Sequence, residues 1–248
     1  MVILSVMDPH AMRAVPLTQL PLRRGPVHAC PYLPGRTAVN EYTFAPLLPP
    51  QDYLALMDRG FRRSGEFVYR PVCDGCRECV PIRVPVARFT PSRSQRRVLR
   101  RNTDVRVAWG TPEPSTAKYE LFVRYLRHQH DGSMSEERED FEDFLYKSPT
   151  QSLEMTYTVL DRIIAVGILD LCPTAISSVY FYFDPDESWR SPGVFGGLCE
   201  IEECRRRALP YWYLGFYVND CARMNYKAAF RPHQLLDSSM QWVDRCSA

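Results

Sequence analysis

One apolar run and two stretches of alternating side chains in the second half of the chain predict three β-strands around one helix. The strands cover residues 163–170, 177–183 and 211–218. Between the second and third strands, a run with helical spacing extends from Gly193 to Arg207. The predicted order is therefore strand, strand, long helix, strand, followed by a short polar segment that ends near Pro232.

Hydroxyl-bearing side chains follow this alternation in the last two strands. Because successive side chains of a strand point to opposite faces, Ser178, Tyr180 and Tyr182 should share one face. The third strand should have two opposite faces, formed by Tyr211, Tyr213, Gly215 and Tyr217 and by Trp212, Leu214, Phe216 and Val218. Each strand thus offers one face with hydroxyl groups and one apolar face, which is typical of an amphipathic sheet.

Further elements are predicted on either side of the charged middle of the chain. Apolar residues at helical spacing predict helices at residues 50–60, 113–130 and 135–146. Residues 153–160 predict a strand that pairs with residues 163–169 through a turn at Asp161 and Arg162.

The order strand, strand, helix, strand is similar to the core of GNAT-type acyltransferases, which implies an α/β (α+β) fold with a mixed sheet. In an acetyl-CoA enzyme, small residues at the start of the helix let the backbone approach a pyrophosphate. Here the loop reads Arg190-Ser191-Pro192-Gly193-Val194-Phe195, and the bulky Phe195 hinders that approach. The loop therefore argues against acetyl-CoA as the acyl donor.

The chain has 248 residues, of which 45% are hydrophobic, as expected of a packed globular protein. We expect an irregular lead-in over residues 1–29, a smaller Cys- and Arg-rich region over 30–108, and a GNAT-like domain over 109–248. Prolines favour an edge position for the strand at residues 80–86. No signal-type leader and no membrane-spanning apolar run is visible, so we expect a cytoplasmic protein without membrane contact.

Positive charge is concentrated in the first half of the chain and comes from arginine alone. Residues 1–110 contain 17 arginines, no lysine and 8 acidic residues. Ser92 or Ser94 can cap a short predicted helix in this part of the chain. The segment carries Arg93, Arg96, Arg97, Arg100 and Arg101. Like charges four residues apart on a helix repel each other, so these arginines are predicted to bind the phosphates of a nucleic acid. A solvated basic face is the alternative.

Three of the nine cysteines, Cys73, Cys76 and Cys79, have a spacing that lets thiolates converge on a zinc ion or an iron–sulfur cluster. Cys30 is the candidate for a fourth ligand. The alternative is a set of reduced thiols around a tight turn at Gly75, because a zinc site normally has two separated pairs of ligands.

Several motifs, taken in order along the chain, resemble the aminoacyl-tRNA–protein transferases of the N-end rule pathway. The matching stretches are residues 30–36, 58–65, 69–71, 89–97, 165–170, 177–181, 213–217 and 224–232. They are most similar to the bacterial branch, the aspartate/glutamate leucyltransferases, which are related to the eukaryotic arginyltransferases. This resemblance implies that leucine passes from leucyl-tRNA to the α-amine of proteins beginning with Asp or Glu, which creates an N-degron for proteolysis.

The resemblance also bears on the cysteines. In eukaryotic relatives, two N-terminal cysteines three residues apart and a downstream cysteine pair bind an iron–sulfur cluster or heme. Cys30 matches the first of these, but Leu33 stands in the second position, and Cys76 and Arg77 stand where the pair is expected. Cys73 and Cys79 lie nearby in the sequence, so the match to the cofactor-binding cysteines of those relatives is incomplete.

The implied reaction needs positioning more than a strong base, because the leucyl ester is activated and an α-amine has a pKa of ~7.7–8.0. We expect a direct transfer without a covalent enzyme intermediate. The candidates for orienting the amine or moving a proton are Asp170, Tyr182 and Tyr217. The acidic end of the protein substrate needs a cation and further hydrogen-bond donors. The candidates for this site are Tyr69, Arg70, Arg83, Lys227 and Arg231. The five helix arginines are the predicted contacts to leucyl-tRNA.

Three other functions stay open from the residues alone. Arginyl-tRNA could replace leucyl-tRNA as the donor, and acetyl-CoA binding would identify a GNAT acetyltransferase. A non-catalytic RNA-binding protein with a Cys-rich metal site would bind RNA without needing the aminoacyl group. The sequence gives no indication of the oligomeric state.

Overall fold

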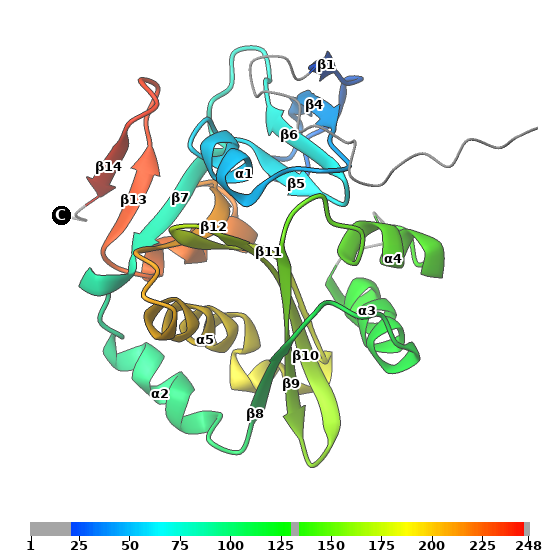
Figure 1. Cartoon of the computed structure of the whole chain (residues 1–248), viewed down its shortest axis with the longest axis vertical. Helices are drawn as coiled ribbons and strands as arrows, with labels where there is room; N and C mark the ends of the chain where they lie inside the picture. The colour runs from blue at the N-terminus through cyan, green and yellow to red at the C-terminus, as the bar shows by residue number, and fades with distance from the viewer. Residues whose placement is uncertain (1–20, 130–133, 246–248) are drawn as a thin grey trace, which may run out of the picture.

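An eight-stranded mixed sheet forms the centre of the protein in a computed structural model that describes residues 21–129 and 134–245 (Figure 1). The strand order is β14-β13-β7-β12-β11-β10-β9-β8. The strands are β7 (Val80–Pro85), β8 (Arg106–Gly110), β9 (Ser152–Val159), β10 (Arg162–Cys172), β11 (Ala175–Phe183), β12 (Tyr211–Tyr217), β13 (His233–Leu236) and β14 (Trp242–Arg245). Only β11 and β12 of these run parallel to each other.

The predicted order of strand, strand, helix, strand is confirmed by β10, β11, the helix α5 (Pro192–Arg206) and β12. The GNAT-like arrangement and the mixed α/β class are therefore confirmed. The predicted hairpin is confirmed as well, since β9 pairs antiparallel with β10. Leu160 and Asp161 form its turn with φ angles of 47° and 64°, in the left-handed region that tight hairpin turns use.

Helices cover both faces of the sheet. They are α1 (Pro50–Met57), α2 (Arg93–Arg101), α3 (Thr116–Gln129), α4 (Arg138–Leu145), α5 and α6 (Ala222–Asn225), with 3-10 turns η3 (Val86–Arg88), η4 (Pro185–Arg190) and η5 (Tyr226–Ala229). Figure 1 shows α3 and α4 on one side of β9, β10 and β11, and α5 with α2 on the other. The predicted helices at residues 50–60, 113–130 and 135–146 are thus confirmed as α1, α3 and α4.

The N-terminal region forms a separate four-stranded sheet with the order β1-β4-β6-β5. Its strands are β1 (Arg23–Arg24), β4 (Asn40–Phe44), β6 (Phe67–Pro71) and β5 (Arg62–Ser64), and a two-stranded hairpin of β2 (His28–Ala29) and β3 (Thr37–Ala38) lies beside it. Of the irregular lead-in predicted for residues 1–29, the first 20 residues lie outside the described part of the chain. The remainder includes the short strands β1 and β2.

The edge position predicted for the strand at residues 80–86 is wrong. Strand β7 lies inside the central sheet, between β12 and β13. Its prolines are tolerated there because Pro85 is the last residue of the strand and Pro81 pairs with Phe216, just beyond an irregularity in β12. This long-range pairing joins the N-terminal region to the central sheet.

A β-bulge in β11 corrects the predicted face of Ser178. Tyr180 pairs with Ile168 and Ser178 with Leu169, which leaves Val179 as an extra residue. An extra residue reverses the alternation of side chains. Ser178 therefore points toward α5, whereas Tyr180 and Tyr182 pack against α3 and α4.

A second irregularity corrects the predicted faces of β12. The pairing with β7 shifts between Tyr213 and Phe216, and Gly215 has a φ of +83°. Phe216 consequently lies on the same face as Tyr213, because both rings lie beside the Arg62 guanidinium. Tyr217 instead packs against the core on the α5 side. The left-handed conformation at this bulge favours glycine.

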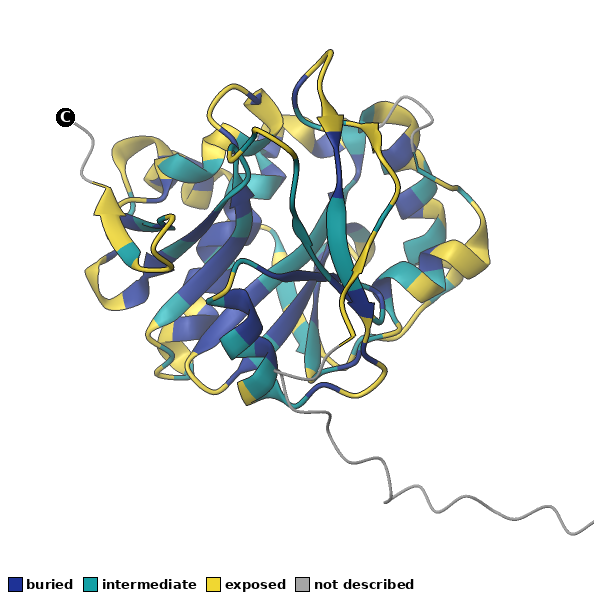
Figure 2. Cartoon of the chain, turned by 90° about the horizontal axis from the view of Figure 1, so that it is seen from above, coloured by how far each residue is buried: buried dark blue, intermediate teal, exposed yellow. Residues whose placement is uncertain are grey.

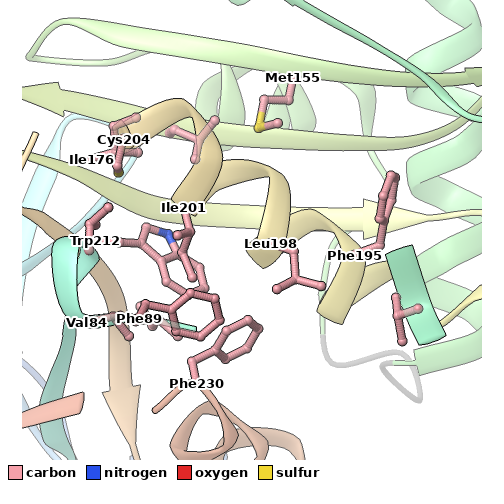
Figure 3. Packing of buried hydrophobic residues seen from close by; sticks show 14 of the residues in the cluster. Val84, Phe89, Met155, Ile176, Phe195, Leu198, Ile201, Cys204, Trp212 and Phe230 are labelled. Atoms are coloured by element: carbon pink, nitrogen blue, oxygen red, sulfur yellow. The ribbon is translucent and has the colours of Figure 1, made fainter. Parts of the chain in front are cut away.

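The largest buried cluster lies between the sheet and α5. Figure 3 shows Trp212 and Phe230 packed beside Phe89, with Ile201 and Leu198 of α5 facing them. A β-carbon on Gly197 would lie 2.7 Å from the Trp212 ring and 2.8 Å from the Phe230 ring. The absence of a side chain there lets the helix approach the sheet closely.

Buried residues are concentrated in the central strands and on the inner faces of the helices, as Figure 2 shows. In the described part of the chain, no helix combines the length and the apolar character needed to cross a membrane.

Candidate active site

A cavity of about 440 Å³ lies where the N-terminal region meets β12. Aromatic side chains from both parts line it: Tyr32, Tyr42, Phe67, Tyr69 and Phe216. Burial raises the pKa values of Tyr32 and Tyr69, so both phenols stay protonated at neutral pH and remain hydrogen-bond donors. The cavity thus combines apolar walls with a few polar groups, as binding sites for organic substrates generally do.

The structure brings Cys30, Cys73, Cys76 and Cys79 to the wall of this cavity. Backbone or side-chain N–H groups already donate to three of the sulfur atoms, at 3.4 Å for Cys30 and Cys73 and 3.7 Å for Cys76. Burial and the neighbouring thiols raise the pKa of Cys79 to about 12, so this thiol is protonated at neutral pH. Within the described ranges, no three Cys, His, Asp or Glu side chains converge closely enough to hold a metal ion. As placed, the four thiols do not fit a metal ion or cluster.

Arg62 was missed by the sequence analysis and lies behind Phe216 of the cavity wall, whereas Arg36 lines the cavity itself. The Arg62 side chain is buried, with an exposed fraction of 5% for the residue. Nη1 donates to the Phe61 carbonyl and Nη2 donates to the Gly215 carbonyl, both at 3.0 Å. Its Nε is buried without a hydrogen-bond partner in the part of the chain that the structure describes.

Lys227 is a second cation that contacts Phe216. Its Nζ donates to the Phe216 carbonyl at 2.8 Å and to the Met224 sulfur at 3.6 Å. Burial, together with the charge of Arg62, lowers the pKa of Lys227 to about 7. Arg62 and Lys227 therefore bind the two successive carbonyl groups at the bulge in β12.

Comparisons with known proteins identify the family to which this chain belongs. The family models described as "Arginine-tRNA-protein transferase, N terminus" and "Arginine-tRNA-protein transferase, C terminus" match residues 28–97 and 117–237. An aspartate/glutamate leucyltransferase of Pseudomonas savastanoi pv. phaseolicola is 40% identical over 221 residues, or 87% of this chain and 93% of that protein. Another from Pseudomonas fluorescens is 39% identical over the same shares. The chain belongs to the arginine-tRNA-protein transferase family.

This transferase is accordingly an aminoacyltransferase, as the resemblance implied. Among solved structures, FemX aligns with 10% sequence identity and a TM-score of 0.48, over 86% of this chain and 84% of that chain.

Of the predicted contacts to an acidic substrate, the structure brings Tyr69 and Lys227 to the cavity region of the transferase. The Tyr69 ring lines the cavity and contacts Phe216, with ring centroids 6.4 Å apart. Lys227 binds the backbone of Phe216 from the other side. These two residues keep their predicted role as a proposal.

The other three predicted substrate contacts lie elsewhere in the transferase. Arg70 pairs with Glu41 at 3.0 Å on the N-terminal sheet. Arg83 lies between the rings of Tyr211 and Trp242, with its guanidinium 3.8 and 4.3 Å from their centroids. Arg231 is exposed and donates to the Ala228 carbonyl. None of these three arginines lines the cavity described above.

The predicted catalytic residues are not gathered at the cavity. Asp170 is fully buried and forms an ion pair with Arg63, and its expected role in orienting the amine stays a prediction. Tyr182 is also fully buried, and its hydroxyl lies 3.3 Å from the Tyr146 hydroxyl. The Tyr217 hydroxyl donates to Asn219 at 2.8 Å.

The arginines predicted to bind tRNA lie together on α2. Ser92 and Gln95 form a capping box at its start, which confirms the predicted cap. All five arginines are exposed: Arg93, Arg96, Arg97, Arg100 and Arg101. None of them forms an ion pair with a carboxylate of residues 21–129 or 134–245. The helix therefore presents a row of uncompensated charge to solvent.

Proposed function

We propose that this transferase moves leucine from leucyl-tRNA to the N-terminal α-amine of proteins that begin with Asp or Glu, which marks them for proteolysis. The observation that carries this proposal is the similarity, over 87% of the chain, to proteins named aspartate/glutamate leucyltransferase. Leucyl-tRNA and proteins with acidic N-termini are the proposed substrates, and the cytoplasm is the proposed compartment. The cavity supports this reaction, because it has apolar walls and its lining residue Phe216 contacts both Arg62 and Lys227.

The chemistry requires the α-amine to attack the ester carbonyl of leucyl-tRNA. A new C–N bond forms, the C–O bond to the terminal ribose breaks, and the proton from the amine passes to the ribose oxygen. The protein's main tasks are to hold both substrates together and to stabilise the oxyanion of the tetrahedral intermediate. In this proposal, the protonated hydroxyls of Tyr32 and Tyr69 supply hydrogen bonds to the reacting groups. No step passes through the cysteine thiols.

Exposed arginines on α2 are the proposed contacts to the tRNA backbone. They are uncompensated within the described chain, as phosphate-binding side chains generally need to be. The loop before α5 does not resemble a pyrophosphate site, because Arg190 binds Asp104 and Glu187 and Phe195 is buried. This arrangement supports an aminoacyl-tRNA donor over acetyl-CoA.

Arginine from arginyl-tRNA is the second candidate donor, because the matching family models carry arginine in their description. The experiment is the transfer of radiolabelled leucine or arginine from charged tRNA to peptides that differ only in residue 1. Leucine on the Asp and Glu peptides, but not on Arg or Ala peptides, is expected. Labelling by arginine alone would identify arginyl-tRNA as the donor. No transfer from either tRNA would contradict the proposed reaction.

A further inference from the structure

Two cationic groups face the same point at the bulge in β12. A β-carbon built on Gly215 would lie 3.8 Å from the Lys227 Nζ and 3.9 Å from the Arg62 Nε, with no other atom closer. Because Gly215 has no side chain, this point is open space between the two cations. The space lies behind Phe216, which lines the cavity.

The two cations have no anionic partner in the described part of the chain. Neither Arg62 nor Lys227 forms an ion pair there. Asp58 interacts with Arg62 at longer range, but its carboxylate already accepts hydrogen bonds from Tyr213 and Trp242 at 2.7 and 2.8 Å. Burying two like charges side by side without an anion is unfavourable. Such an arrangement is therefore expected where an external anion binds.

The free donors match a carboxylate. Each terminal nitrogen of Arg62 donates one of its two N–H groups to a backbone carbonyl, and Nε is buried without a partner in the described part of the chain. Lys227 has three donors, of which one goes to the Phe216 carbonyl and one to the Met224 sulfur. One free donor on each cation can bind the two oxygens of a carboxylate. The exposed arginines of α2 are the proposed contacts to the tRNA backbone, whereas Arg62 is buried and lies beside Phe216 of the cavity wall.

We propose that Arg62, Lys227 and the gap at Gly215 form the receptor for the side-chain carboxylate of the protein substrate's first residue. This inference rests on the proposed function and gives its acidic specificity a location. A substrate beginning with Asn or Gln has the same shape without the charge. It would leave both cations buried and unpaired, so the receptor rejects it. Arg62 is thus a specificity-determining residue that the sequence analysis did not include.

The test compares peptides beginning with Asp and Asn in the transfer reaction. The wild-type protein is expected to prefer Asp over Asn in kcat/KM. The variant Lys227→Gln is expected to lower this preference by about 10-fold or more, mainly through the KM for the Asp peptide, as for loss of a charged hydrogen bond. The KM for leucyl-tRNA should stay unchanged. Lys227→Arg, which keeps the charge, should retain most of the preference.

The matched control is Lys147→Gln. Lys147 is exposed, follows the C-terminal end of α4 and pairs with Asp143 of that helix. This control should leave the Asp preference as in the wild type. An active Lys227→Gln protein with an unchanged Asp-to-Asn ratio overturns the inference. A higher KM for leucyl-tRNA with an unchanged ratio also overturns it and assigns the cations to the tRNA end.

Direct peptide binding separates this inference from the reaction itself. Calorimetry with the full chain, without tRNA, is expected to show that Asp peptides bind the wild type more tightly than the Lys227→Gln variant. Thermal unfolding checks that each variant is folded. If the wild type transfers no leucine, the proposed function fails, while equal binding by wild type and Lys227→Gln would refute the receptor alone.

Discussion

The Arg63 guanidinium and the Asp170 carboxylate form a bidentate ion pair inside the protein, with N–O distances of 2.6 and 2.8 Å. Both side chains have an exposed fraction of 0%. The pair joins β5 of the N-terminal sheet to β10 of the central sheet, and the Ser152 hydroxyl donates to the same carboxylate at 2.7 Å. Because both charges have lost their hydration, each depends on the other for compensation.

Replacing Asp170 with Asn is therefore expected to lower the free energy of unfolding by about 3–5 kcal/mol, since it leaves the Arg63 charge buried and unpaired. Urea unfolding followed by circular dichroism measures this loss. The double variant Arg63→Met with Asp170→Leu removes both charges and should lose less than the two single variants together. If Asp170→Asn keeps its full stability but loses leucine transfer, the original expectation that Asp170 orients the amine would be supported.

Local sequence patterns predicted the elements of the fold well. The apolar run in residues 163–170 and the alternation in residues 177–183 predict β10 and β11, and Ser92 caps the start of α2. The position of β7 was not predictable in this way, because its partners lie more than 100 residues later in the chain. Pairings between distant segments leave no trace in local periodicity.

The candidate site depends on features that periodicity hides. The bulge at Val179 adds one residue without changing the local composition, so it reversed the predicted face of Ser178. At the second bulge, Gly215 within an aromatic strand was a usable signal, since an isolated glycine in a strand often marks a bulge. Arg62 gave no such signal, because its burial depends on contacts with β12.

Metal removal tests the arrangement of the cysteines. Since the thiols of Cys30, Cys73, Cys76 and Cys79 do not converge, we expect that protein purified without oxygen has leucine transfer activity that survives treatment with chelators. Iron and zinc are measured by elemental analysis before and after treatment, with activity measured on the same samples. Stoichiometric iron or zinc, lost together with activity, would instead support the predicted metal site.

Stability should also depend on pH through Glu200 of α5. This residue is 4% exposed, and the Trp212 Nε1 donates to its carboxylate at 2.7 Å. Burial raises the pKa of Glu200 from 4.5 to about 7, although hydrogen bonds from Ser178 and Trp212 oppose the shift. The folded state then binds more protons than the unfolded state between these two values, so stability falls as the pH rises from about 4.5 through 7.

The variant Glu200→Gln removes this titration. It should be more stable than the wild type above pH 7, by at most roughly 3 kcal/mol, with the difference shrinking toward pH 4.5. Thermal unfolding of both proteins between pH 5 and 8 gives the comparison. A constant difference in melting temperature across this range would show that Glu200 is not the group responsible.

The exposed arginines of α2 make a prediction about ionic strength. If Arg96 and Arg97 each contact one phosphate of leucyl-tRNA, replacing both with Ala removes two sites of counterion release. Binding should weaken, and the slope of log affinity against log salt should become shallower by about 1.4–1.8. Filter binding or fluorescence anisotropy across a salt series measures both quantities. The matched control replaces Arg127 and Arg138, exposed arginines that already pair with Glu136 and Glu142, and it should leave the slope unchanged. An equal slope in the α2 variant and the wild type would leave the solvated basic face as the explanation for these charges.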